Sequence, residues 1–360
     1  MNRRMVYTCI VALGSVCLSL ALLEGGIRLV APQPTKVSVP TILDPDMIYR
    51  LPANARGTDV KEEFAVKIET NSLGLRDRDY AREKPHGVIS RMLVMGDSMT
   101  FAEGVEAEET YPKLLEQLLA RRAGPGKYEV INAAIRGYGT DQELVLFQKL
   151  LPVFRPDVVV LAFFAGNDFT DNLYGRIFDV RDGRLIRLPL SAESSPKYRY
   201  YARQSAIQAF PGYQTLIKYS HLMNLIRRRW ARMEFQRNFQ ESEQVDPGSE
   251  EQAQRLTEML LERWAEMARY NDVRPVLLLL PSWDQIYSGR DDVNDARVDR
   301  VIDLARRLKV PAIDARPALR EAARGPEPVF YPQDRHLTVK GHRAVSDYLY
   351  RALSAQGLVP

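Results

Sequence analysis

A serine follows an apolar segment at a place where it could act as a nucleophile. Residues 91–95 are Arg-Met-Leu-Val-Met, and the run ends abruptly at Gly96-Asp97-Ser98. If this run is a buried strand, the Ser98 hydroxyl lies on a tight turn at the carboxyl end of the strand, where open α/β sheets bind ligands. A nucleophile also needs a base and donors for an oxyanion. Taken alone, Gly-Asp-Ser is ordinary turn chemistry, and Ser98 could simply cap the next helix.

A histidine near the C-terminus is the candidate base. The chain has only four histidines, which are His86, His221, His336 and His342. An isolated histidine is usually structural, but His336 follows Asp334 by two residues and comes directly before a predicted helix. At that spacing the Asp334 carboxylate could orient the imidazole of His336. His342 lies inside the predicted helix, and we expect it to pack or to form a hydrogen bond there.

Two other turns at predicted strand ends carry groups that could hold a negative charge. The apolar run 157–164 leads into Gly166-Asn167-Asp168, and the side-chain amide of Asn167 could donate to an anion. The strand predicted at 128–133 leads to Gly137, whose unobstructed backbone N–H can approach a ligand closely. Both residues also have a simpler interpretation, as a helix cap and as a turn glycine. We expect Asp97 and Asp168 to brace their turns rather than to react.

The elements that must position these residues alternate between strand and helix. Strands are predicted at 91–95, 128–133, 157–164, 276–280 and 311–313, and helices at 110–122, 141–153, 252–270, 296–309 and 338–355. The near-continuous apolar run 157–164 is typical of a central parallel strand that is covered on both faces. The alternation predicts a three-layer α/β/α domain over residues 71–358. The heterogeneous segment 171–250, with a hairpin at 177–190 and a helix at 213–239, is expected to be an insertion or cap.

The N-terminus is predicted to be a membrane anchor over residues 1–28. Met5–Leu23 is an uncharged apolar stretch of about 19 residues, close to the roughly 20 that a spanning helix needs. It is longer than the apolar part of a cleavable signal peptide and has no clear cleavage site, which favours an uncleaved anchor over a cleaved signal. Arg3 and Arg4 predict a cytoplasmic N-terminus, with the bulk of the chain outside. Residues 29–70 are expected to be a stalk and lead-in.

Composition narrows the possible partners. The formal net charge is only +4 over 360 residues and no basic stripe carries interleaved aromatics, which argues against a nucleic-acid partner. The run Arg227-Arg228-Arg229 is expected to face solvent or anionic lipid. Both cysteines, Cys9 and Cys17, lie in the apolar stretch, so no disulfide and no cysteine-based zinc site is expected in the exported part. The sequence implies no metal and no organic cofactor.

The four blocks that carry candidate chemistry occur in the order typical of one superfamily. Over residues 70–355 the chain resembles the SGNH hydrolases, also called GDSL-like lipases and esterases. Ser98, Gly137, Asn167 and His336 match the four namesake residue types. The resemblance implies a flavodoxin-like fold, with Ser98 as nucleophile, His336 as base and Asp334 as the orienting acid. It also implies that the N–H groups of Ser98 and Gly137 and the Asn167 amide hold the oxyanion.

The match has one departure with consequences for the mechanism. The superfamily commonly places its acid three residues before the histidine, where this chain has Gln333, whereas Asp334 stands two residues before. Similar Asp-x-His-Leu endings occur in related branches, so Asp334 is assigned as the acid. If its carboxylate does not reach the imidazole, the alternative is a Ser98–His336 dyad. Met99 in place of the usual leucine is a conservative change.

The resemblance extends to a membrane-anchored bacterial branch through residues 94–105, 109–112 and 137–142. Members of that branch often stand near cell-surface polysaccharide pathways. We therefore predict a serine hydrolase in the bacterial inner membrane that cleaves an O-acyl or O-acetyl ester on an extracytoplasmic carbohydrate or lipid. The alternatives are an O-acyltransferase that uses the same serine and an inactive anchored binding or scaffold subunit. A nucleotide-binding protein is disfavoured because no glycine-rich phosphate loop follows the first core strand.

Overall fold

The chain divides into two compact units. The computed structural model describes residues 3–35, 38–243, 247–288 and 292–360. The smaller unit comprises Met1–Val37 and Ala206–Gln244, and the larger unit comprises Ser38–Ser205 and Val245–Pro360. The larger unit contains the predicted sheet and all the candidate site residues.

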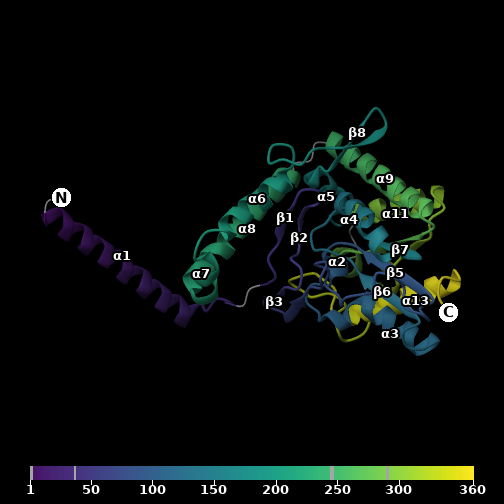
Figure 1. Ribbon diagram of the computed structural model, residues 1–360, viewed down its shortest axis with the longest axis horizontal. Coiled ribbons are helices and arrows are strands. Elements are labelled where there is room, and N and C mark those ends of the chain that lie inside the picture. Colours follow the sequence, from purple (N-terminus) through teal and green to yellow (C-terminus); the bar gives the residue numbers. More distant parts are fainter. Residues whose placement is uncertain (1–2, 36–37, 244–246, 289–291) are drawn as a thin grey trace. The chain divides into compact units, whose positions relative to one another are not determined.

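Five parallel strands form the sheet of the larger unit (Figure 1). In chain order they are β5 (Ser90–Met95), β6 (Tyr128–Asn132), β7 (Val158–Phe164), β10 (Arg274–Leu280) and β11 (Ala312–Asp314). They lie side by side in the order β11-β10-β7-β5-β6. This is the 2-1-3-4-5 order of flavodoxin-like sheets, whose switch point lies between the first and third strands, here β5 and β7. Ligand-binding residues are expected at the carboxyl ends of these two strands.

Helices cover both faces of the sheet. On one face, α4 (Thr140–Phe154), α9 (Pro247–Tyr270) and α11 (Asp292–Arg307) pack with strand residues such as Leu161 and Leu277. On the other face, α3 (Tyr111–Ala123), α12 (Arg316–Ala322) and α13 (Val339–Ala355) pack with neighbouring strand residues such as Val160 and Leu278. Successive strand side chains point to opposite faces, so continuous apolar strands fill both layers. The predicted three-layer fold is confirmed.

The segment 29–70, expected to be a stalk and lead-in, contains two antiparallel hairpins. β1 (Ile42–Asp44) pairs with β2 (Ile48–Arg50), and β3 (Arg56–Val60) pairs with β4 (Ala65–Glu69). The side chains of Ile48 and Tyr49 are fully buried in the core on the α4 face. Strands of three to five residues are too short for a period-2 pattern to stand out, so the sequence did not reveal them.

The expected insertion 171–250 contributes to both units. Part of it joins the larger unit through α5 (Asp168–Gly175), the predicted hairpin of β8 (Phe178–Arg181) and β9 (Arg184–Arg187), and most of α6 (Pro196–Gln208). The helix expected over 213–239 is divided at Ser220, which has extended backbone, into α7 (Tyr213–Tyr219) and α8 (His221–Glu243). Three further short helices belong to the larger unit: α2 (Ser98–Phe101), the 3₁₀ turn η1 (Ala107–Glu109) and α10 (Trp283–Tyr287).

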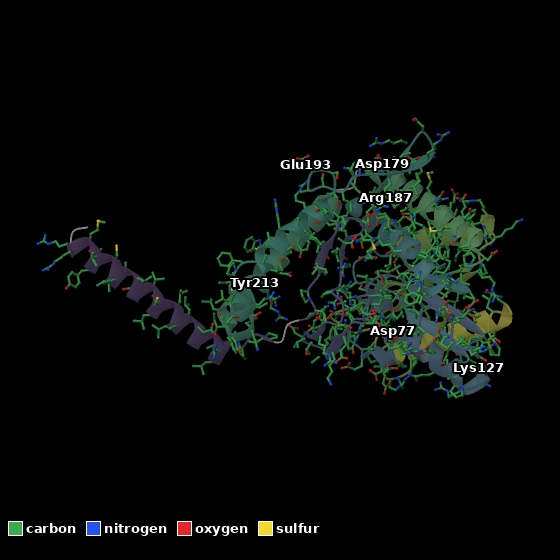
Figure 2. All side chains as sticks on the ribbon, in the orientation of Figure 1. Asp77, Lys127, Asp179, Arg187, Glu193 and Tyr213 are labelled. Carbon is green, nitrogen blue, oxygen red and sulfur yellow. The ribbon has the colours of Figure 1, made fainter. Side chains whose placement is uncertain are left out.

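The smaller unit is built from α1 (Arg3–Val30) with α7 and α8. By length and composition, the 28-residue α1 could cross a membrane, and its most apolar window has no buried residue. Its side chains project outward along its length (Figure 2). The predicted N-terminal apolar helix is therefore present, and it continues two residues beyond the predicted boundary at residue 28.

A buried arginine gives a test of how the sheet is stabilised. The wholly buried Arg91 side chain donates to the Glu129 carboxylate at 2.6 Å and to the Phe154 carbonyl at 2.8 Å. Arg91→Met would leave Glu129 buried without its partner, so we expect the free energy of unfolding to fall by about 3 kcal/mol. Urea denaturation of the detergent-solubilised chain, followed by tryptophan fluorescence, measures this change.

An exposed ion pair of the larger unit supplies the matched control. Arg56 and Glu69 lie 3.6 Å apart with both side chains mostly in solvent. Arg56→Met should therefore lower the free energy of unfolding by less than about 1 kcal/mol. Equal losses in the two variants would contradict the role assigned to Arg91.

Candidate active site

The nucleophile turn connects β5 directly to α2. A Cβ on Gly96 would lie 2.4 Å from the Thr100 hydroxyl oxygen, so the turn closes only with glycine there. Asp97 caps α2, because its Oδ1 accepts the Met99 N–H at 2.9 Å. The cap of this helix is therefore Asp97 and not Ser98, whose partly exposed side chain is left for another partner.

A chain of hydrogen bonds joins Ser98 to Asp334 through the imidazole of His336. His336 Nε2 lies 2.9 Å from Ser98 Oγ, and His336 Nδ1 lies 2.6 Å from Asp334 Oδ1. With the ring proton on Nδ1, the imidazole donates to the carboxylate and accepts from the serine hydroxyl. Ser98 and His336 are 238 positions apart in the chain, and the fold brings these three predicted residues together.

The loop before α13 explains how an acid two residues before His336 reaches its ring. Arg335, between the two, has a φ of +66°, in the left-handed region. The Tyr331 N–H donates to the His336 carbonyl at 2.8 Å, and the Arg335 N–H donates to the Tyr331 carbonyl at 2.9 Å. The backbone therefore doubles back at Arg335. Gln333, at the position where the superfamily commonly has its acid, is exposed.

Two residues of the lead-in hold this loop, and neither was predicted from the sequence. Lys61 Nζ donates to Asp334 Oδ2 at 2.7 Å and to Glu103 Oε2 at 2.6 Å. The Glu63 carboxylate accepts the backbone N–H groups of Gln333 and Asp334, the latter at 2.6 Å. Lys61 and Glu63 lie in the turn between β3 and β4. No spacing in the sequence relates that turn to residues 333–336, so no local signal could have revealed them.

Glu103, Asp334 and His336 form a cluster of a kind that can hold a metal, with ligand atoms within 4.8 Å of one another. The Lys61 ammonium bonds both carboxylates of this cluster, and the Arg136 guanidinium lies 3.8 Å from Glu103. Burial alone would raise the pKa of Glu103, but Arg136, His336 and Lys61 together lower that pKa to about 2. Side-chain cations thus already balance these carboxylates, and the cluster supports the His336 loop.

The two other predicted oxyanion residues lie at the same sheet edge. Asn167 and Gly137 follow β7 and β6, the strands on either side of β5. Asn167 Nδ2 donates to Asp97 Oδ2 at 3.3 Å, which places the amide beside the Ser98 turn, and the Asn167 side chain makes no capping bond to α5. Gly137 has a φ of +71°, and a Cβ there would lie 2.9 Å from the Tyr49 hydroxyl. Both the backbone and its surroundings therefore require glycine at 137.

The acids expected to brace the turns are buried and hydrogen-bonded to them. Asp168 Oδ2 accepts the Phe164 N–H at 2.8 Å, across the turn that follows β7. Burial, together with the nearby Glu143 and Asp97 carboxylates, raises the pKa of Asp168 well above its usual value. Burial also raises the pKa of Asp97 to about 6, against the opposing hydrogen bond from Met99. Neither acid bonds Ser98 or His336 among the described contacts.

Burial and hydrogen bonding shift the pKa values of His336 and Asp334 in opposite directions. Burial lowers the pKa of His336, but the hydrogen bond to Asp334 and the Glu103 carboxylate outweigh it, so the pKa lies above its ordinary 6.5. Burial raises the pKa of Asp334, but the hydrogen bonds from His336 and Lys61 outweigh it and lower that pKa below its usual value. The pair is thus an ionised carboxylate beside an imidazole of increased basicity, as suits a general base.

The His336 pKa can be measured directly. Asp334→Asn removes the partner that most strongly favours the protonated ring, so we expect the pKa of His336 to fall in this variant. With four histidines in the chain, an NMR titration of imidazole resonances can resolve each one, with His336→Gln identifying its signal. His86 serves as the internal control. An unchanged His336 pKa in Asp334→Asn would show that the carboxylate does not act on the ring.

A comparison with solved structures finds several chains that are similar to this one over much of its length. Similar solved structures include an acetyl xylan esterase from Geobacillus stearothermophilus, at 15% identity over 74% of this chain and 95% of that chain, with a TM-score of 0.43. An esterase from Pseudoalteromonas sp. matches at 12% identity over 74% and 98%, with a TM-score of 0.39. An α/β hydrolase from the metagenome of Lake Arreo, Spain, matches at 16% identity over 77% and 100%, with a TM-score of 0.44. No curated protein matches the chain.

The family assignment comes from the sequence match. The model of the GDSL-like lipase/acylhydrolase family matches residues 94–344, which is well over half of the chain and runs from the end of β5 into α13. This range includes Ser98, Gly137, Asn167, Asp334 and His336. The chain belongs to the GDSL-like lipase/acylhydrolase family and is an ester hydrolase.

Proposed function

We propose that this protein hydrolyses an O-acyl ester of a carbohydrate or lipid outside the cytoplasm, with Ser98 as the nucleophile. The observation that carries the proposal is the hydrogen-bond chain from Ser98 Oγ to His336 Nε2, at 2.9 Å, and from His336 Nδ1 to Asp334, at 2.6 Å. The apolar run of α1, which follows Arg3 and Arg4 at the start of the helix, supports a single-pass anchor in the bacterial inner membrane with a cytoplasmic N-terminus. The hydrolase unit then lies on the extracytoplasmic side.

Acylation begins with proton transfer to His336. Nε2 takes the Ser98 hydroxyl proton while Oγ forms a bond to the ester carbonyl carbon, which gives a tetrahedral intermediate. Asp334 keeps the ring proton on Nδ1 and stabilises the imidazolium. The intermediate collapses when the bond to the leaving oxygen breaks, and His336 gives its proton to that oxygen. An alcohol leaves and the acyl group stays on Ser98.

Deacylation repeats the same proton transfers with water. His336 takes a proton from the water, whose oxygen attacks the acyl carbon. The bond to Ser98 Oγ then breaks, and His336 returns the proton to that oxygen. A carboxylic acid leaves and the enzyme is restored.

The oxyanion formed in each half-reaction needs hydrogen-bond donors. The backbone N–H groups of Ser98 and Gly137 and the Asn167 side chain are assigned to this role. The side-chain nitrogen of Asn167 carries two N–H groups. One of them donates to Asp97, which leaves the other to donate to substrate. Loss of one such donor typically lowers turnover by about 10²–10³-fold.

Hydrolysis of p-nitrophenyl acetate by the full chain tests the nucleophile. Ser98→Ala removes the attacking oxygen, so we expect kcat to fall by about 10⁴-fold or more. Labelling by a fluorophosphonate probe should be lost in the same variant. Ser72→Ala, at an exposed serine of the larger unit, should leave both readouts unchanged.

Equal rates for wild type and Ser98→Ala would exclude Ser98 as the nucleophile. Acylated sugars and lipids, offered with and without a sugar acceptor, then define the substrate. Acyl transfer to the acceptor in preference to water would replace hydrolysis by O-acyltransfer as the function.

Lys61 is assigned as a positioning residue that acts through Asp334. Only neutral His336 can accept the serine proton, so with its pKa above 6.5 the acid limb of kcat/KM should lie above pH 6.5. The positive charge of Lys61 lowers the pKa of His336, so Lys61→Met should move this limb to still higher pH. The Asp334 carboxylate should keep its bond to His336 but be held less firmly, so kcat should also fall by about 10-fold, with KM little changed.

Two variants make the Lys61 test specific. Lys61→Arg keeps the charge and should restore the acid limb toward its wild-type position. Lys67→Met removes an exposed lysine of the same hairpin and should change neither the limb nor kcat. If Lys61→Met leaves the limb unmoved while stability falls, the role of Lys61 is structural only.

A further inference from the structure

Helix α8 exposes an apolar stripe that the ester chemistry does not use. The residues on this face follow helical spacing; they are the apolar Leu222, Leu225, Ile226, Trp230 and Met233, with Arg229 among them. The exposed fractions are 50% for Ile226, 57% for Trp230 and 61% for Met233. Five of the six line a surface groove, which is continuous from Leu225 to Met233. Large apolar side chains gathered on one exposed face mark an interaction surface.

The charge of this part of α8 has one sign. Residues 221–233 include four arginines, Arg227, Arg228, Arg229 and Arg232, and no aspartate or glutamate. Arg229 itself lines the groove. A helix with tryptophan and aliphatic residues on its apolar face and with many arginines is typical of elements that lie in the headgroup region of anionic bilayers.

Contacts within the smaller unit fix the start of α8 to the end of the apolar run in α1. Glu24 is the first charged residue after that run, and its carboxylate accepts from Ser220 Oγ, the His221 N–H and the Leu222 N–H, each at 2.8 Å. Arg28 donates to the Tyr219 carbonyl at 2.7 Å. Glu24 thereby satisfies N–H groups that the first turn of any helix leaves unpaired.

This anchoring determines where α8 begins relative to a bilayer. If α1 spans the membrane, Glu24 lies where the chain leaves the hydrocarbon region, because a charged side chain inside that region is costly and rare. The first turn of α8, bonded to Glu24, then lies at the same depth. The stripe begins at Leu222, within this turn, so it starts at the membrane surface.

We propose that α8 binds the surface of an anionic phospholipid bilayer beside α1. Ile226, Trp230 and Met233 enter the boundary between headgroups and acyl chains, and Arg229, which lines the same groove, binds lipid phosphates. The smaller unit thus contacts the membrane twice, through a spanning helix and an interfacial one. This inference rests on the proposed anchoring by α1, and it goes beyond the proposed ester hydrolysis.

A fluorescent label on the stripe of the full chain tests the proposal. Cys9 and Cys17 are the free cysteines of the described residues, both in α1, so Cys9→Ala with Cys17→Ala gives a background for labelling. Met233→Cys carries an environment-sensitive fluorophore, and each chain is placed alone in a lipid nanodisc. Phosphatidylcholine discs are compared with discs that also contain phosphatidylglycerol.

The expected result is a blue-shifted emission at residue 233 and a severalfold slower quenching by aqueous iodide, both stronger with phosphatidylglycerol. The same label on Tyr270→Cys, where the native side chain is 90% exposed, gives the reference for full contact with water. Arg229→Gln should weaken the dependence on phosphatidylglycerol. If the label at residue 233 is quenched as fast as the one at residue 270, the proposal is overturned.

Other occupants of the stripe give different outcomes. Protection that appears only in crowded vesicles and not in single-chain discs would mean that a second copy covers the face, which also overturns the proposal. Extraction by alkaline carbonate tests the α1 anchor separately, because a spanning helix resists it. Hydrolysis of p-nitrophenyl acetate by the same discs shows that the labelled chain is folded and tests the ester chemistry independently.

Discussion

The hydrogen bond between Asp334 and His336 is the contact on which the rest of the site depends. It fixes the tautomer of the imidazole, and through it the direction of the lone pair that meets Ser98. Such a short bond needs an acid that is ionised and held in place. The Lys61 ammonium gives Asp334 a neighbouring positive charge and a second hydrogen bond, and the Glu63 carboxylate accepts the backbone N–H of Asp334. The acid therefore works as part of a network that extends into the lead-in hairpin.

The sheet accounts for why this network forms where it does. Parallel strands bring their carboxyl ends to one edge, and the 2-1-3-4-5 order opens that edge between β5 and β7. Ser98 follows β5 and Asn167 follows β7, so they lie on either side of this point. Asn167 donates a hydrogen bond to Asp97, which caps the helix that begins at Ser98. The loop that carries His336 meets Ser98 at this same edge of the sheet. The geometry of the candidate site is thus largely a consequence of strand order.

The predictable and the unpredictable parts of the molecule differ in a physical way. β7 and the turns at Ser98 and Asn167 could be predicted because a continuous apolar run and a glycine-containing turn are local signals. The role of Lys61 could not be predicted, since its partner Asp334 is 273 positions away. The break at Ser220 was hidden for the same reason, because the carboxylate that caps α8 comes from Glu24 in another part of the chain. Local sequence patterns indicate strands, helices and turns, whereas the Lys61 and Glu24 contacts arise only in the tertiary structure.

The contact between the β3–β4 turn and the histidine loop also constrains how the protein can be made. During synthesis Lys61 emerges 273 positions before Asp334. Because domains can begin to fold during synthesis, the sheet has time to form before this ion pair can close. A growing chain therefore acquires its acid–histidine pair only after all five strands of the sheet have been made. Any recombinant fragment that starts where the family match starts, at residue 94, would lack the ammonium group altogether.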